Sequence, residues 1–132
     1  MDQATLEKLF REFDTRFFGG RLAGGTLVLL DPHMSNYGYC ERDATVIRLS
    51  PLEPMDEDCT LIHEMTHAYV TRFGSGMAVT PEAAAAAEEF GRGYGEGHTP
   101  AFFSKLFEVM RHRGHHPVRH FGRYCGAHAS VA

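Results

Sequence analysis

The sequence predicts a single domain of the α+β class. Its 132 residues are a usual length for one globular domain, and 43% of them are hydrophobic against 23% charged. This composition excludes a disordered chain, which has few apolar residues and a high net charge. Short β-branched and aromatic runs occur only in residues 26–49, and helical periodicity lies on both sides of them. We therefore treat residues 1–132 as one domain without repeats or linkers.

The first third of the chain predicts one helix followed by a small sheet. Apolar residues recur at steps of three and four from Leu6 to Phe17, and Gly19-Gly20 ends this amphipathic helix. Three strand-like runs follow, separated by turn-forming residues, at positions 26–30, 37–41 and 45–49.

The rest of the chain predicts three further helices. Acidic residues beginning at Asp56 suit a helix N-terminus, and a broad apolar face continues from there to Gly74. An alanine-rich helix is expected over residues 81–90. Thr99-Pro100 is typical of an N-cap followed by proline at the first helical position, and the helix that it starts should run to Gly114.

The second predicted helix contains the sequence HEMTH, an HExxH motif at residues 63–67. Positions i and i+4 stack on one helix face, so His63 and His67 can bind the same metal ion. Glu64 lies beside that face and can act as a general base on a water molecule. Polar groups in a buried apolar helix are costly unless they have partners, which favours a metal over histidines held by hydrogen bonds alone. Zinc fits this donor set best.

A catalytic zinc site needs a third protein ligand, and the residues leave two candidates. His98 follows a glycine-rich loop and directly precedes a capped helix, so it can be turned inward from a fixed anchor. Glu88 or Glu89, about 20 residues after His67 on the alanine-rich helix, is the alternative and would place the chain among glutamate-ligand zincins. Surface glutamates near a helix end are common, so His98 is preferred.

Five segments together resemble the SprT-like zinc metalloprotease family, of the type of the Spartan protease domain. In chain order they are FDTRFFGGRLAGGTLVL, YGYCERDATVIRLSP, CTLIHEMTHAYV, GHTPAFFSKLFEVM and VRHF. The third and fourth are the most specific, and the resemblance spans residues 5–121.

This resemblance implies a zincin-like metalloprotease fold with Zn²⁺ as its cofactor. His63, His67 and His98 would be the zinc ligands and Glu64 the general acid/base. The implied activity is an endopeptidase acting on protein or peptide substrates, including DNA-associated or DNA-crosslinked proteins in DNA repair, and VRHF would form a closing strand. Two departures are visible: 30 residues separate His67 from His98, and no cysteine zinc ribbon follows the domain.

Charge and cysteine content bear on partners and compartment. Residues 1–108 have a net charge of −8, whereas residues 109–132 hold four arginines, five histidines and no acid. This basic, His-rich segment could contact DNA weakly, although the acidic body opposes it. Three cysteines without a CxxC pair, no signal peptide and no transmembrane run predict an intracellular protein, cytoplasmic or nuclear, without membrane contact. Nothing in the sequence specifies an oligomeric state.

Several further residues could have either a functional or a purely structural role. The tyrosines that could donate to an oxyanion are Tyr37, Tyr39, Tyr94 and Tyr124. The histidines of the C-terminal segment are expected to form a solvated tail rather than a second metal site, and of these His120 could differ because its strand should pass near the fourth helix: His112, His115, His116 and His120. Cys40 and Cys59 are expected to be small buried residues. The glycine-rich part of residues 75–97 could act as a lid or simply connect two helices.

Two other functions stay open from the sequence. One is a non-catalytic, zinc-stabilised module that binds DNA or a protein. The other is a zinc hydrolase with a non-peptide substrate.

Overall fold

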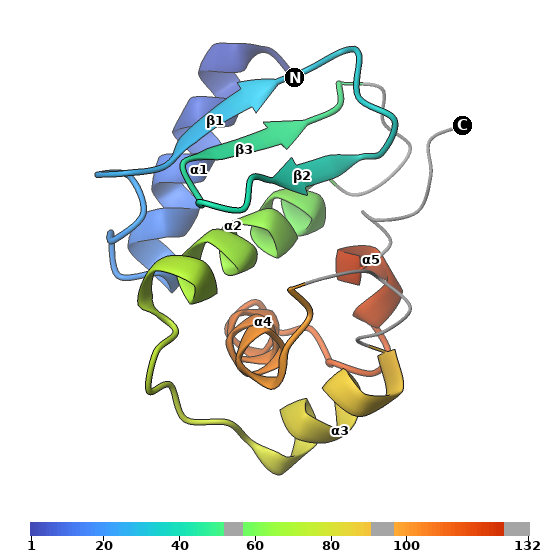
Figure 1. Ribbon diagram of the computed structural model, residues 1–132. Helices are drawn as coiled ribbons and strands as arrows, with labels where there is room; N and C mark the ends of the chain where they lie inside the picture. Colours follow the sequence, from blue (N-terminus) through green and yellow to red (C-terminus); the bar gives the residue numbers. More distant parts are fainter. Residues whose placement is uncertain (52–56, 91–96, 126–132) are drawn as a thin grey trace.

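A computed structural model of the protein describes residues 1–51, 57–90 and 97–125. In this part of the chain, a three-stranded sheet lies at one end of the molecule, and five helices lie beside and beneath it (Figure 1). In chain order the elements are α1 (Gln3–Phe17), β1 (Leu27–Leu30), β2 (Gly38–Cys40), β3 (Val46–Leu49), α2 (Glu57–Phe73), α3 (Pro81–Phe90), α4 (Pro100–His112) and α5 (Phe121–Cys125). The α+β class is confirmed.

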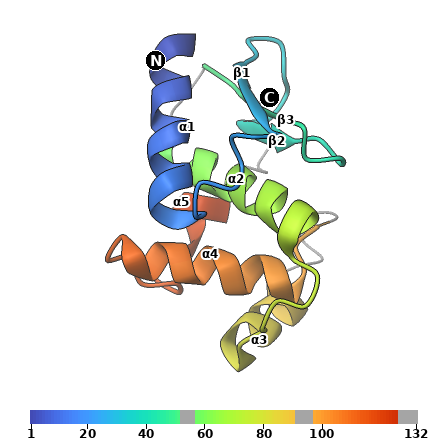
Figure 2. The same ribbon diagram turned by 90° about the vertical axis from the view of Figure 1, so that its left-hand side faces the viewer.

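The sheet has the order β1-β3-β2, with β1 parallel and β2 antiparallel to the central strand β3. Gly38 of β2 lies opposite Leu49 of β3. β2 is thus an edge strand among the described residues, since it pairs with β3 alone. Figure 2 shows that α1 flanks the sheet and that α2 runs beneath it.

Helix α2 is the centre of the molecule. It lies between the sheet and α4, and α3 packs on the far side of α4 (Figures 1 and 2). Its residues Leu61, Ile62, Met65 and Ala68 are fully buried, as expected for a helix covered on two sides. The HExxH motif therefore sits on the most enclosed helix of the fold.

The link between α1 and β1 is fixed by two polar side chains. Buried Asp14 accepts hydrogen bonds from the backbone N–H groups of Leu22 and Ala23, both at 3.0 Å. Arg72, near the end of α2, donates to the Leu22 carbonyl at 2.9 Å and to Thr26 Oγ1 at 3.1 Å. These bonds tie the loop before β1 to both neighbouring helices.

The prediction of a closing strand at residues 118–121 is wrong. Residues 117–120 form turns and α5 begins at Phe121, an element that the periodicity did not reveal. Here the backbone is satisfied locally: His120 N donates to the His116 carbonyl at 2.9 Å, and His116 N donates to His120 Nδ1 at 2.9 Å. A segment whose backbone groups are bonded within a turn has none left for a sheet.

The other expected elements are present, with small shifts at their ends. α4 ends at His112, two residues before Gly114, which adopts a positive φ of 76°. The expected start of α2 at Asp56 lies outside the described residues. No helix in the described part of the chain combines the length and the apolar character needed to cross a bilayer.

Candidate metal centre

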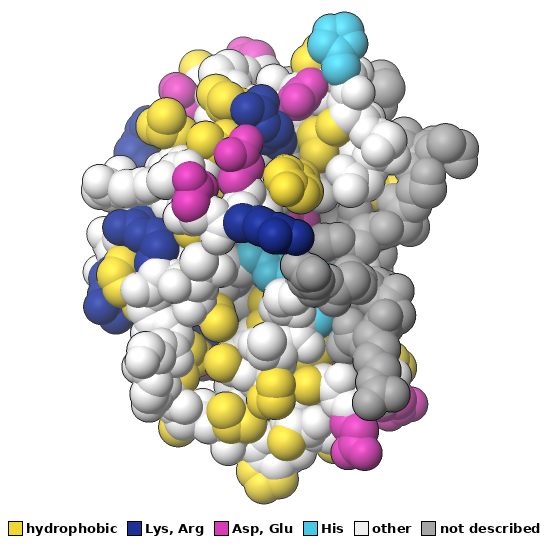
Figure 3. All heavy atoms as spheres, viewed as in Figure 1, with side chains coloured by type: hydrophobic (Ala, Val, Ile, Leu, Met, Phe, Trp, Pro, Cys, Tyr) yellow, Lys and Arg dark blue, Asp and Glu magenta, His cyan; other side chains and the backbone are white. Residues whose placement is uncertain are grey.

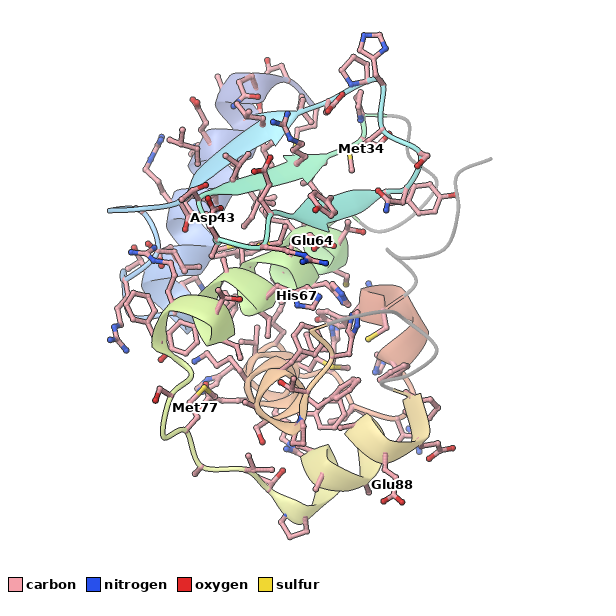
Figure 4. The ribbon with its side chains drawn as sticks, in the orientation of Figure 1. Met34, Asp43, Glu64, His67, Met77 and Glu88 are labelled. Carbon is pink, nitrogen blue, oxygen red and sulfur yellow. The ribbon has the colours of Figure 1, made fainter. Side chains whose placement is uncertain are left out.

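Helix α2 supplies three of the four predicted site residues. His63 and Glu64 are fully buried, and His67, one turn further along, is partly exposed. Figure 4 shows Glu64 and His67 close together on α2, below the sheet. The helical repeat brings the two histidine rings to a centroid distance of 4.9 Å.

The fourth residue, His98, comes from the turn that precedes α4. Thr99 is the N-cap of this helix and accepts a hydrogen bond from the Phe102 backbone N–H at 3.3 Å, with Pro100 at the first helical position. Gly97, on the other side of His98, adopts a φ of 91°. These two neighbours fix the chain direction at His98, whose side chain is 5% exposed and points at α2.

The three histidines converge through their Nε2 atoms. His98 Nε2 lies 3.2 Å from His63 Nε2 and 3.2 Å from His67 Nε2. Nitrogens about 2.0–2.1 Å from a zinc ion and placed at tetrahedral corners would be about 3.3 Å apart. The observed separations therefore match the ligand spacing of a tetrahedral zinc site.

Hydrogen bonding among the three rings does not account for this convergence. A neutral imidazole nitrogen carries either one proton or one lone pair in the ring plane. His98 Nε2 faces two other ring nitrogens at the same distance and can form a linear bond with only one of them. Three ligand nitrogens within 4.8 Å of one another can bind one metal ion. Among the described residues, these histidines are the one group of three or more His, Cys, Asp or Glu side chains close enough to hold a metal ion.

Phe102 supports all three histidine rings. Its ring stacks on His67 with a centroid distance of 4.3 Å and lies 5.0 Å from each of the other two rings. Phe102 is fully buried and belongs to α4, four residues after His98. The sequence identified it only as a core residue of that helix, because its contact with α2 is a tertiary one.

The Glu64 carboxyl is held in an apolar environment next to the three histidines. Burial raises its pKa from 4.5 to about 8 in the metal-free protein. A cation at the histidines would favour the carboxylate and lower that pKa again. Burial, followed by the Glu64 charge, also raises the pKa of Cys40 to about 12, so this thiol is a poor nucleophile. Metal binding at the histidines would therefore favour the ionised form of Glu64.

A cavity of about 230 Å³ opens beside the metal centre. Glu64 and His67 form part of its wall, and the remainder comes from β2, the turn after it, α2 and the start of the α4 segment: Tyr39, Cys40, Glu41, Arg42, Thr71 and Gly97. Figure 3 shows histidine side chains reaching the surface in the middle of this face. His67, one candidate ligand, is partly exposed at this cavity, whereas Glu64, the candidate base, is fully buried in its wall.

No family model, curated protein or solved structure matches this chain.

The alternative third ligands lie elsewhere. Glu88 and Glu89 are both exposed on α3, and Figure 4 shows Glu88 on the outer side of that helix, well away from His67. The structure brings His98, not these glutamates, to the two histidines of α2.

The tyrosines considered for an oxyanion role are dispersed. Tyr39 is 44% exposed and lines the cavity. Tyr124 is fully buried, and its hydroxyl contacts His115 and accepts a hydrogen bond from Arg113 at 2.9 Å. Tyr37 is half-buried, and Tyr94 lies outside the described residues. Tyr39 is thus the one described tyrosine placed at the cavity.

The glycine-rich loop, the C-terminal histidines and the cysteines lie outside the candidate ligand set. The predicted lid falls on residues 91–96, outside the described part. His115 and His120 stack on each other with a centroid distance of 4.9 Å, in the turn before α5. All three cysteines are free; Cys59 is buried as expected, whereas Cys40 is only half-buried.

Proposed function

We propose that the protein is a zinc-dependent endopeptidase, similar in its site to the SprT-like metalloproteases. The observation that carries this proposal is the convergence of three histidine Nε2 atoms beside one buried carboxyl, that of Glu64, at an open cavity. A purely structural zinc site is usually closed by four protein ligands, whereas three ligands leave a position for a reactant.

Zinc is the metal that this site favours. Three neutral imidazoles suit borderline metals and not magnesium or calcium, which prefer oxygen ligands. When bound, zinc would polarise a peptide carbonyl and lower the pKa of a water molecule toward neutrality.

Glu64 performs the proton transfers in this proposal. Its carboxylate accepts a proton from the water molecule as the water oxygen attacks the carbonyl carbon of the peptide. The resulting carboxylic acid donates that proton to the leaving nitrogen as the C–N bond breaks. Burial raises the pKa of this carboxyl in the metal-free protein, and a bound cation would lower it again, which keeps the carboxylate form available as the base.

The position of the cavity supports a peptide substrate. It borders β2, which pairs with β3 on one side only within the described residues. An outer strand edge presents backbone N–H and C=O groups that an extended peptide can pair with. This favours a peptide over a small non-peptide substrate.

Cleavage of casein by the zinc-loaded protein tests the proposal, with self-cleavage and a DNA-linked protein as further substrates. We expect cleavage that stops on addition of a chelator and returns with zinc. The Glu64→Gln variant should bind zinc and fail to cleave, because an amide cannot accept the proton. Cleavage by that variant at the wild-type rate would overturn the role of Glu64.

The same experiment separates the alternative functions. Zinc binding without cleavage of any protein would favour a zinc-stabilised binding module. Cleavage stimulated by DNA would support the DNA-associated substrates that the family resemblance implies. The DNA contact would then involve the basic C-terminal segment, of which the structure describes residues 109–125.

A further inference from the structure

We infer that Gly38 is a positioning residue for the proposed reaction: the absence of a side chain there allows β2 to lie directly against Glu64 and fixes the place of its carboxylate. This inference rests on the proposed function, since it concerns the residue that moves the proton. Gly38 is buried and is the first residue of β2.

A side chain at residue 38 would press on two side chains of α2. A Cβ atom at this position would lie 2.9 Å from Glu64 Oε2 and 3.1 Å from Glu64 Cγ. It would also lie 2.9 Å from Cγ2 of Thr60, one helical turn before Glu64. Carbon atoms that are not bonded to each other pack at about 3.5–4.0 Å, so an added methyl group must displace something.

The backbone conformation does not explain the glycine. Gly38 is not among the glycines with positive φ, which in the described chain are Gly19, Gly20, Gly76, Gly97 and Gly114. An alanine would otherwise be tolerated here and would stabilise the protein slightly by restricting the unfolded chain. The requirement for glycine therefore comes from the contact with α2.

The strand cannot easily move away to make room. Gly38 is paired with Leu49 of β3, and backbone hydrogen bonds hold both ends of β2: Ser50 N to the Tyr37 carbonyl at 3.0 Å and Glu41 N to the Val46 carbonyl at 2.9 Å. Helix α2 is equally confined, since Leu61 and Met65, the neighbours of this contact along the helix, are fully buried. An added methyl group must therefore be accommodated by the side chains that it meets, those of Glu64 and Thr60.

A methyl group at residue 38 should therefore shift the Glu64 carboxylate and leave the metal ligands in place. No histidine is among the three atoms nearest to the added Cβ. Displacing a catalytic group by about 1 Å can lower a rate by about 10²-fold. The expected signature is a loss in kcat without a loss of zinc.

The first measurement compares Gly38→Ala with Gly24→Ala in the zinc-loaded protein. A Cβ at Gly24 meets nothing within 4 Å, and Gly24 also lacks a positive φ, so it is a matched control. For Gly38→Ala we expect kcat to fall by about 10- to 100-fold, with KM and the zinc content per chain unchanged. Gly24→Ala should match the wild type in all three. An unchanged kcat in Gly38→Ala would overturn the inference.

The second measurement needs no activity. Thermal unfolding of the zinc-free protein is compared for Gly38→Ala, Glu64→Ala and the double variant. Gly38→Ala should lower the Tm of the wild type by more than it lowers the Tm of Glu64→Ala, because truncating Glu64 removes the contacts with Cγ and Oε2 and keeps the one with Thr60. Equal Tm losses in the two backgrounds would overturn the contact with Glu64.

The two measurements also separate this inference from the proposed function. If the wild type cleaves no substrate, the proposed function fails, and the unfolding cycle still decides whether Gly38 constrains Glu64. If the wild type cleaves and Gly38→Ala cleaves equally well, only the positioning role fails.

Discussion

Gly97 lies directly against the imidazole ring of His67. A Cβ atom at residue 97 would be 3.2 Å from both Cε1 and Nδ1 of that ring. Gly97 also has a φ of 91°, in the left-handed region that L side chains rarely adopt. One glycine thus packs on His67, a candidate metal ligand of α2, and directly precedes the next candidate ligand, His98.

Gly97→Ala should weaken zinc binding, because the methyl group presses on the His67 ring and moves its Nε2 out of line. We expect about a tenfold rise in the zinc dissociation constant, as found when groups around a metal site are disturbed. Competition with a chromophoric chelator measures it. Gly76→Ala is the control: its φ of 80° imposes a similar backbone strain, but its Cβ meets nothing within 4 Å. Equal zinc affinity in the two variants would exclude the ring contact as the cause.

His98→Ala should lose zinc far more readily than Glu88→Ala or Glu89→Ala. His98 Nε2 lies 3.2 Å from both other ligand nitrogens, whereas the two glutamates are exposed on α3. Metal analysis after dialysis measures the zinc that remains. The opposite order would assign the site to the glutamate-ligand zincins.

The free energy of unfolding of the metal-free protein should fall as the pH rises, because the buried Glu64 carboxyl must lose its proton. Its pKa is raised by burial from 4.5 to about 8, so the folded state holds this proton more tightly than the unfolded chain. The resulting stabilisation is fully present below pH 4.5 and is lost as the pH rises through about 8. Glu64→Gln abolishes this dependence, and at the alkaline end the variant should be more stable than the wild type by on the order of 2–4 kcal/mol.

Urea unfolding in the presence of a chelator measures this difference across the same pH range. The two proteins should differ little at the acidic end and increasingly toward the alkaline end. Parallel stability curves would show that Glu64 titrates alike in the folded and unfolded states.

Asp14→Ala should destabilise the fold without affecting the zinc affinity. The buried carboxylate accepts two backbone N–H groups, from Leu22 and Ala23, and both would be left without it. Bonds to a charged acceptor contribute about 1.5–3 kcal/mol each, and we expect a total loss of about 3 kcal/mol in the unfolding free energy. Urea unfolding measures the loss, and Asp14→Asn, which keeps one acceptor oxygen, should lose less. An unchanged unfolding midpoint in Asp14→Ala would show that water replaces the carboxylate.

Local sequence features predicted most of the elements and the candidate ligands. Apolar periodicity located α1, α2 and α4, because in these helices the buried face is continuous. The i, i+4 spacing of His63 and His67 predicted their convergence, and the Thr99-Pro100 helix start indicated how His98 could be anchored. Each of these signals depends only on residues that are close in sequence.

Features that depend on tertiary contacts were not predicted. No local pattern indicates that Gly38 meets Glu64 or that Phe102 contacts three histidine rings, because these residues come from separate elements. The prediction of a strand at residues 118–121 is wrong. The turn there is held by two hydrogen bonds between His116 and His120, one from the His116 N–H to the His120 ring and one from the His120 N–H to the His116 carbonyl, and residue type alone does not reveal them.

Zinc at this site would close a loop in the chain. His67 and His98 are 31 positions apart, and the chain between them contains α3, whose Ala83 and Ala86 are buried against α4. Joining two distant positions costs chain entropy, and that cost falls when the intervening segment is already ordered. We therefore expect the packing of α3 on α4 to be coupled to the metal affinity. Loosening this helix pair would weaken zinc binding without any change to a ligand, and bound zinc would in turn hold the helix pair together.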